Sequence, residues 1–156
     1  MEATENAALA TSGTDDLLQQ WTAAQAGFHR LTIRLAEEVT RRTDLPASSV
    51  QILLLLLHSP PYHSVTMTEL ARHLEFSTAG ITKVTDRLTH AGLIVRSPCQ
   101  IDRRVVRATL TPEGLQAARQ AADILADALN REVIAKIGQE DFARLTDLLT
   151  ALDPSR

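Results

Sequence analysis

The sequence is poor in cysteine and in aromatic residues. Among 156 residues there is one cysteine, Cys99, and there are only one Trp, one Tyr and three Phe. A single cysteine excludes an internal disulfide framework and any zinc site built from several thiolates. With so few aromatic rings, the core has to be aliphatic, and Leu and Ala, which are good helix formers, are expected to supply it.

Long apolar runs and a basic leader are also missing. The longest apolar run, residues 52–57, is far too short to cross a bilayer. The first five residues are acidic and have neither a basic nor an apolar stretch, so we expect no secretory signal, no membrane partner and a cytoplasmic location. A hydrophobic fraction of 44% with 22% charged residues is typical of a globular chain, and the length fits a single domain of ordinary size.

The net charge of the whole chain does not indicate a nucleic-acid partner, but the distribution of charge along the chain does. The whole chain carries a formal net charge of −3. Residues 67–111, however, contain seven basic and four acidic side chains, whereas the remainder contains nine basic and fifteen acidic ones. This asymmetry indicates a basic working surface on an acidic frame.

Apolar spacing and capping residues predict a mainly helical fold. Steps of three and four residues predict a long helix over 15–42. The all-round apolar stretch 50–58 favours a buried helix, although periodicity alone leaves a buried strand open there. Thr66 and Glu69 form a capping box before a short helix. Ser77 caps a second helix that runs to about Ala91, and Gly92 follows as a left-handed C-cap. Two helices joined by a tight turn indicate a helix-turn-helix.

A hairpin and further helices follow the helix-turn-helix. Alternating β-branched residues at 93–95 and 105–110 flank a polar segment, which predicts a two-stranded wing with a long tip. Thr111 and Pro112 open another long helix, and Gly138 interrupts it before a last one. We therefore predict a mainly α fold with a small β-hairpin wing. Its parts are a flexible arm at 1–14, a helical dimerisation region at 15–45 and 112–152, and a winged helix-turn-helix domain at 46–111. Dimerisation is expected because the helices at the two ends carry apolar faces that a second copy would bury.

The helix pair, chiefly its second helix, and the wing carry the candidate DNA contacts. Small and hydroxylated residues in the first turn let a helix approach the duplex, and its backbone N–H groups bind phosphate. Lys83 suits a phosphate or a guanine edge, and an arginine on the wing suits a narrow minor groove. An Asp two residues before an Arg can hold that side chain in one rotamer. The candidates are Thr68, Ser77, Thr78, Ala79, Thr82, Lys83, Arg87, Asp102, Arg103 and Arg104.

These elements together resemble a known family. The stretch MTELARHLEFSTAGITKVTDRLTHAGLIVRSPCQIDRRVVRATLTPEG is similar to the multiple-antibiotic-resistance-regulator (MarR) family in its capped helix, its AGLIVR segment, its D-R-R wing and its LTPEG exit. The resemblance implies a homodimer that binds pseudo-palindromic double-stranded DNA, usually as a repressor relieved by a small ligand or an oxidant. It also implies that Arg104 enters the minor groove and that Asp102 orients it.

Some residues outside the helix pair and the wing suggest further functions. Trp21, Phe28 and His29 are candidates for an aromatic or phenolic effector, with core or dimer contacts as the alternative. Cys99 on the wing leaves a redox role open, and five histidines without a supporting cluster leave metal sensing as a weaker alternative. No phosphate loop or nucleophile elbow is present, so we expect neither an enzyme, a cofactor nor a bound metal. A winged-helix module that binds protein is the remaining alternative.

Overall fold

The computed structural model describes residues 2–152, with side chains from residue 13 onward, and contains two compact units, Met1–Leu35 and Ala36–Arg156. Helix α1 spans Glu2–Thr43 and crosses the boundary between the units. It starts thirteen residues before the predicted Asp15, so residues 2–14 are helical where the sequence predicted a loose arm. Alanine is the commonest residue in this stretch, and its high helix propensity lets the helix extend toward the N-terminus.

The core of the second unit forms around helix α2, Ala47–Leu57. Ile52, Leu53 and Leu56 are fully buried, which confirms the buried helix that the apolar run favoured. Helix α2 packs against α5, Pro112–Leu129, whose Ala118 and Ala121 present no side chain beyond Cβ. Small residues on α5 allow the two helices to approach closely, because a core is packed to near-crystalline density.

The predicted helix-turn-helix is formed by α3, Met67–His73, and α4, Thr78–His90. The Thr66 hydroxyl accepts a hydrogen bond from the Glu69 N–H at 3.1 Å, and the Glu69 carboxylate accepts one from the Thr66 N–H at 3.0 Å. The predicted capping box is therefore confirmed. Ser77 caps α4 as predicted, and Gly92 follows it with a left-handed φ of 70°.

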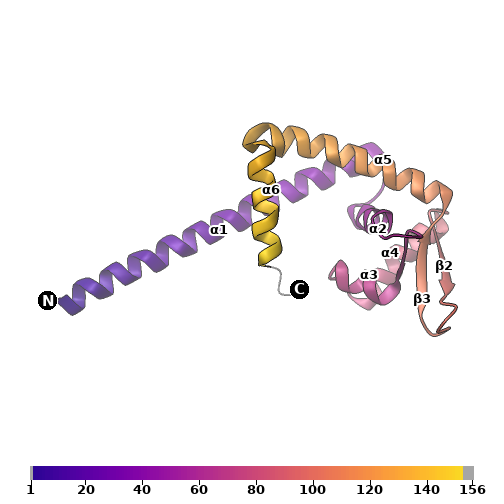
Figure 1. The fold of residues 1–156 in the computed structure, drawn as a ribbon, viewed down its shortest axis with the longest axis horizontal. Helices are drawn as coiled ribbons and strands as arrows, with labels where there is room; N and C mark the ends of the chain where they lie inside the picture. Colours follow the sequence, from indigo (N-terminus) through magenta and orange to yellow (C-terminus); the bar gives the residue numbers. More distant parts are fainter. Residues whose placement is uncertain (1, 153–156) are drawn as a thin grey trace. The chain divides into compact units, whose positions relative to one another are not determined.

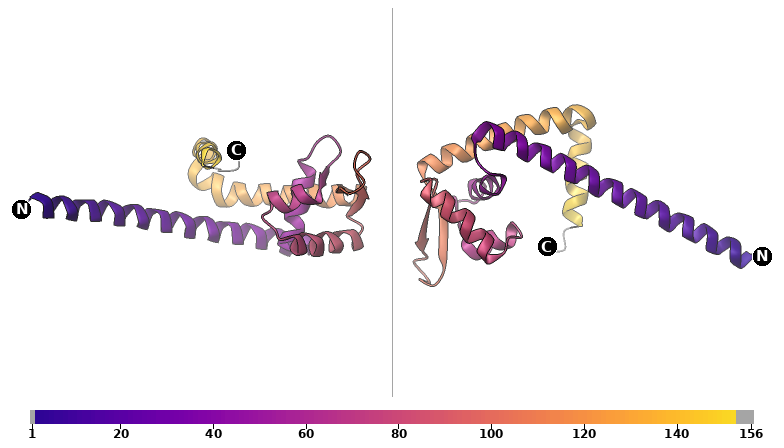
Figure 2. Two further views of the ribbon diagram at one scale, coloured as in Figure 1. Left: turned by 90° about the horizontal axis from the view of Figure 1, so that it is seen from below. Right: turned by 180° about the vertical axis from the view of Figure 1, so that it is seen from behind.

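The wing is part of a three-stranded antiparallel sheet and not of a simple hairpin. Strands β2, Ile94–Pro98, and β3, Val106–Leu110, form the predicted hairpin, and β1, Ser64–Thr66, adds to the other edge of β3. A strand of three residues is too short for alternation to reveal it, and here it forms because β3 offers it a pairing edge. Figures 1 and 2 show the β2–β3 hairpin beside α4, with its tip clear of the helices.

The chain after the sheet is helical to Ala151. Helix α5 is followed by a π-helical turn η1, Asn130–Ile134, and by α6, Ala135–Ala151, which is interrupted at Gly138 with a φ of 81°. This confirms the predicted break. No residue of α6 is buried, and the exposed leucines of α6 and its C-cap share one face at positions 145, 148, 149 and 152.

Candidate nucleic-acid interface

Helix α4 presents one apolar face to the core and one polar face to solvent. Ile81, Val84 and Leu88 are buried, together with Thr85, whose hydroxyl donates to the carbonyl of Ile81. The exposed face contains every α4 residue that the sequence predicted, together with its N-cap: Ser77, Thr78, Ala79, Thr82, Lys83 and Arg87. The first turn thus offers hydroxyls, a methyl group and backbone N–H groups to a ligand.

The hydroxyls at the start of α4 differ in which hydrogen bonds they can still form with a ligand. Ser77 Oγ accepts from the N–H of Gly80 at 3.1 Å, and Thr82 Oγ1 donates to the carbonyl of Thr78 at 2.8 Å. The proton of Thr82 is therefore engaged within the helix, and its oxygen remains an acceptor. The Thr82 oxygen can accept a hydrogen bond from an amino group of a base in the major groove. Its methyl group can contact the methyl group of a thymine.

A hollow of about 410 Å3 lies where α3, α4 and the wing meet. It is lined by Thr68 of α3, Thr78 and Thr82 of α4 and Arg104 of the wing, along with apolar residues and Arg96. These four predicted contacts are separated by up to 36 positions in the sequence, yet the fold gathers them around one concavity. Lys83, Arg87 and Arg103 are exposed but do not line it.

The basic side chains of residues 67–111 fall into two groups. Arg96 forms an ion pair with Asp86 at 2.5 Å, and Arg107 donates to Ser64, so both are held within the fold. In the part of the chain that the structure describes, the other five have neither a hydrogen bond nor an ion-pair partner: Arg72, Lys83, Arg87, Arg103 and Arg104. Unpaired surface cations of this kind are free to neutralise phosphates.

Asp102 supports the tip of the wing in a different way from the one predicted. Its Oδ1 accepts a hydrogen bond from the backbone N–H of Arg104 at 3.0 Å, and its carbonyl accepts one from the N–H of Val105 at 3.0 Å. Within residues 13–152 no ion pair joins the Asp102 carboxylate to the Arg104 guanidinium. In this structure Asp102 fixes the backbone of the turn, a local bond typical of Asp in turns, and its orienting of the Arg104 side chain stays a prediction.

Arg107 connects strand β3 of the wing to β1, the strand that precedes α3. From β3 its Nε and Nη2 donate to the hydroxyl and the carbonyl of Ser64 on β1, at 3.1 and 2.7 Å. Hydrogen bonds from Thr66 lower the pKa of Glu69, and the positive charge of Arg107 adds to that lowering. In the sequence Arg107 is one more cation among seven; only the pairing of β1 with β3 reveals its role.

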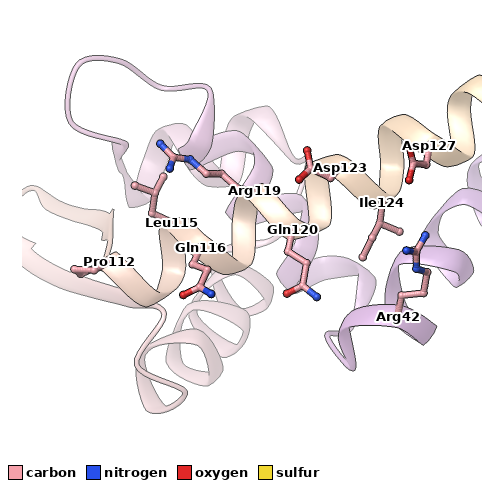
Figure 3. A pocket seen from close by; sticks show the side chains of 9 residues that line it. All are labelled: Arg42, Pro112, Leu115, Gln116, Arg119, Gln120, Asp123, Ile124 and Asp127. Carbon is pink, nitrogen blue, oxygen red and sulfur yellow. The ribbon is translucent and has the colours of Figure 1, made fainter.

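The residues predicted to bind an effector are not enclosed by the described part of the chain. Trp21, Phe28 and His29 are exposed on α1, in the first unit. In the second unit a wide groove of about 660 Å3 follows α5, where Arg42, Leu115 and Ile124 lie among polar side chains (Figure 3). No local pattern in the sequence indicates this groove, because its wall combines Arg42 at the end of α1 with residues of α5.

Cys99 and the histidines are the candidates for redox chemistry and metal binding. Backbone N–H groups of Asp102 and Ile101 lower the pKa of the half-buried Cys99 thiol. Within the described residues no three His, Cys, Asp or Glu side chains come together as metal ligands. None of the described helices combines the length and the apolar character needed to span a membrane.

A capped helix pair, a three-stranded wing and a hollow between them define a winged helix-turn-helix domain. Residues 43–105 match the sequence model of the MarR family. The regulator PapX of Escherichia coli is 36% identical over 67 residues, which cover 43% of this chain and 41% of PapX. The chain thus spans less than half the length of this relative.

Solved structures extend the likeness beyond the matched segment. AbsC, a MarR family regulator from Streptomyces coelicolor, shares 28% identity, with a TM-score of 0.74 over 86% of this chain and 88% of that one. Sco3205, a MarR family regulator from the same organism solved in complex with DNA, shares 25% identity, with a TM-score of 0.75 over 85% and 82% of the two chains. The resemblance to the MarR family is therefore confirmed: residues 43–105 match the family's sequence model, and the fold matches solved structures of MarR family regulators.

Proposed function

We propose that this protein is a homodimeric, sequence-specific DNA-binding regulator of transcription, and that it acts as a repressor relieved by a small ligand. Residues 46–111 would bind DNA, and residues 15–45 and 112–152 would form the dimer. The observation that carries the proposal is the hollow that gathers Thr68, Thr78, Thr82 and Arg104, beside cations that have no partner among the described residues. The DNA complex of Sco3205, which has the same fold, supports the choice of DNA as the ligand.

The side chains of α4 and of the wing would contact different parts of the DNA, according to their chemistry. The first turn of α4 enters the major groove, where Thr82 and the methyl of Ala79 meet base edges. Lys83 and Arg87, on the exposed face of the same helix, meet phosphates or a guanine edge. Arg104 enters the minor groove, where the narrow walls strengthen its attraction to DNA. Ser77 and Thr68 offer hydroxyls to the backbone, and Arg103 adds charge.

The dimer and the effector are supported by exposed apolar surface. The leucines of α6 and the residues Leu17, Trp21 and Phe28 of α1 are all exposed in the single chain. Burial of such surface contributes about 25 cal/mol per Å2, so pairing of two chains is favoured. A planar aromatic acid held by Trp21, Phe28 and His29 would act as the relieving ligand. Operator binding measured in the presence of a panel of such acids tests the proposed effector, and loss of binding with one of them is the expected result.

Titration of a labelled fragment upstream of the protein's own gene, at two salt concentrations, tests the proposal. A DNA-binding protein that neutralises several phosphates loses affinity steeply as salt rises. A winged-helix module that binds protein instead would show little change of DNA affinity with salt concentration, that is, a small salt slope. That outcome would overturn the proposal. Arg104→Ala should weaken binding by about 1–3 kcal/mol and reduce the slope, whereas unchanged binding would contradict the role of the wing.

A further inference from the structure

The wing tip carries an apolar side chain that is almost fully exposed. Ile101 is 97% exposed, whereas Val95 at the base of the same wing is 50% exposed and Val106 is 38% exposed. Single exposed apolar residues are common on protein surfaces. Ile101 differs because it immediately precedes Asp102, Arg103 and Arg104. The most exposed apolar side chain of the wing therefore lies next to two exposed arginines.

Hydrogen bonds fix the backbone on both sides of Ile101. The N–H of Cys99 donates to the carbonyl of Val105 at 2.7 Å, and the N–H of Val105 donates to the carbonyl of Asp102 at 3.0 Å. The Asp102 carboxylate adds its bond to the N–H of Arg104. The tip is therefore closed by contacts within the turn, and Ile101 projects from a braced loop. An ordered tip lowers the entropy lost when the side chain meets a partner.

DNA offers a surface that matches this combination of groups. The walls of the minor groove are deoxyribose rings, which present C–H groups, and phosphates line its rims. Proteins that enter the minor groove use Arg for the negative potential and apolar side chains such as Ile for contact with the sugars and base steps. A tip with Ile101 beside Arg103 and Arg104 offers both kinds of contact at once.

We propose that Ile101 is a specificity-determining residue that packs against the sugars and A·T base edges of the minor groove, next to Arg104. This inference rests on the proposed DNA-binding function. The exocyclic amino group of guanine projects into the minor groove, so a G·C pair would hold Ile101 away from the floor. The apolar contact therefore favours A·T pairs under the wing without any hydrogen bond to a base.

The variant Ile101→Ser tests the proposal, since a side chain this exposed leaves folding unchanged. With the whole 156-residue chain and the labelled upstream fragment, we expect affinity to fall about three- to tenfold per wing, from partial loss of one buried Ile contact. The salt slope should stay the same, because no charge is removed. Val95→Ser is the matched control, an exposed apolar residue on the same wing, and should bind like the wild type.

A modified duplex separates the minor groove from other contacts. Replacing adenine by 2,6-diaminopurine under the wing adds an amino group in the minor groove and leaves the major-groove pattern intact. The wild type should lose affinity on this duplex, and Ile101→Ser should lose less. Equal losses, or unchanged affinity of Ile101→Ser on the normal duplex, would overturn the role of Ile101 while leaving DNA binding standing. Failure of the wild type to bind the fragment would overturn both proposals.

Discussion

Arg104 and Arg107 lie three positions apart in the wing and differ in their contacts. The guanidinium of Arg107 is half-buried and donates twice to Ser64, whereas Arg104 is exposed and lines the hollow beside α4. A charged group that is already hydrogen-bonded within the fold stabilises that fold and has little left for a phosphate. The two arginines should therefore respond differently to the same substitution.

Replacing each arginine by glutamine separates these roles. Arg107→Gln should lower the free energy of unfolding by about 1–2 kcal/mol, because charge-assisted bonds between β3 and β1 are lost. Its salt slope of DNA binding should match the wild type. Arg104→Gln should leave stability within about 0.5 kcal/mol and reduce the slope. Urea unfolding and DNA titration measure the two effects, and the reverse pattern would contradict the assignment.

Ser49 is the one buried side chain with an unsatisfied polar atom in the described part of the molecule. It is fully buried in α2, and its Oγ has no hydrogen-bond partner there. Ser49→Ala removes an uncompensated hydroxyl and improves helix propensity, so the free energy of unfolding should rise by about 1 kcal/mol. Ser48→Ala on the same turn, which is only half-buried, is the control and should change stability less. A loss of stability in Ser49→Ala would show that the hydroxyl has a partner.

At the scale of the element, the capping box makes the start of α3 sensitive to acid. The pKa of Glu69 is lowered from its ordinary value of 4.5, chiefly by hydrogen bonds from Thr66. A carboxyl group with a lowered pKa in the folded state stabilises the fold above its unfolded pKa, and this stability is lost as pH falls through the folded pKa.

Glu69→Gln should therefore weaken the cap and flatten the pH dependence. Near neutral pH we expect a loss of about 0.5–2 kcal/mol, the range for helix caps. From about pH 7 to about pH 3 the variant should lose less stability than the wild type, because the titrating carboxyl is absent. Urea unfolding at several pH values measures both effects. Parallel pH profiles for the two proteins would refute this account of Glu69.

The junction of the wing with α5 depends on a glycine. A Cβ on Gly114 would lie 1.8 Å from the carbonyl oxygen of Leu93, and that same carbonyl accepts the N–H of Thr111 at 3.1 Å. The first turn of α5 therefore packs directly on the backbone between α4 and β2. Substitution at this position forces two main chains apart.

Gly114→Ala should destabilise the protein by about 1–3 kcal/mol, the usual range for overpacking. Gly27→Ala is the matched control, since that glycine lies in α1 and a Cβ added to it would meet no atom within 4 Å. There helix propensity predicts a gain of about 0.5–1 kcal/mol. Thermal unfolding of both variants tests the junction. Equal effects of the two substitutions would show that Leu93 does not constrain Gly114.

At the scale of the whole molecule, exposed apolar faces predict a dimer. Leu145, Leu148, Leu149 and Leu152 lie on one face of α6 and its C-cap, and no residue of α6 is buried within the single chain. In size-exclusion chromatography with light scattering, the wild type should elute at twice the chain mass of 17.1 kDa. Leu145→Asp with Leu149→Asp should produce monomers, and Tyr62→Asp, a change at an exposed loop residue, should not. A monomeric wild type at micromolar concentration would contradict the proposal.

The sequence by itself determined most of the elements of this fold. Caps at Thr66, Ser77 and Thr111, the left-handed glycines and the apolar spacing are local signals, because the bonds they report join residues a few positions apart. The helix pair and the hairpin were predictable for this reason. The extension of α1 to Glu2 was missed because propensity without periodicity is only a weak signal there.

Tertiary structure alone decided which side chains are available for binding. Strand β1, the bonds of Arg107 to Ser64, the ion pair of Arg96 with Asp86 and the approach of Gly114 to Leu93 all join residues that are distant in the sequence. Seven basic residues look alike in the sequence, and only the fold separates two whose side chains are paired within it from five whose side chains have no partner among the described residues. Contacts between distant segments depend on how whole elements pack, which no local pattern records.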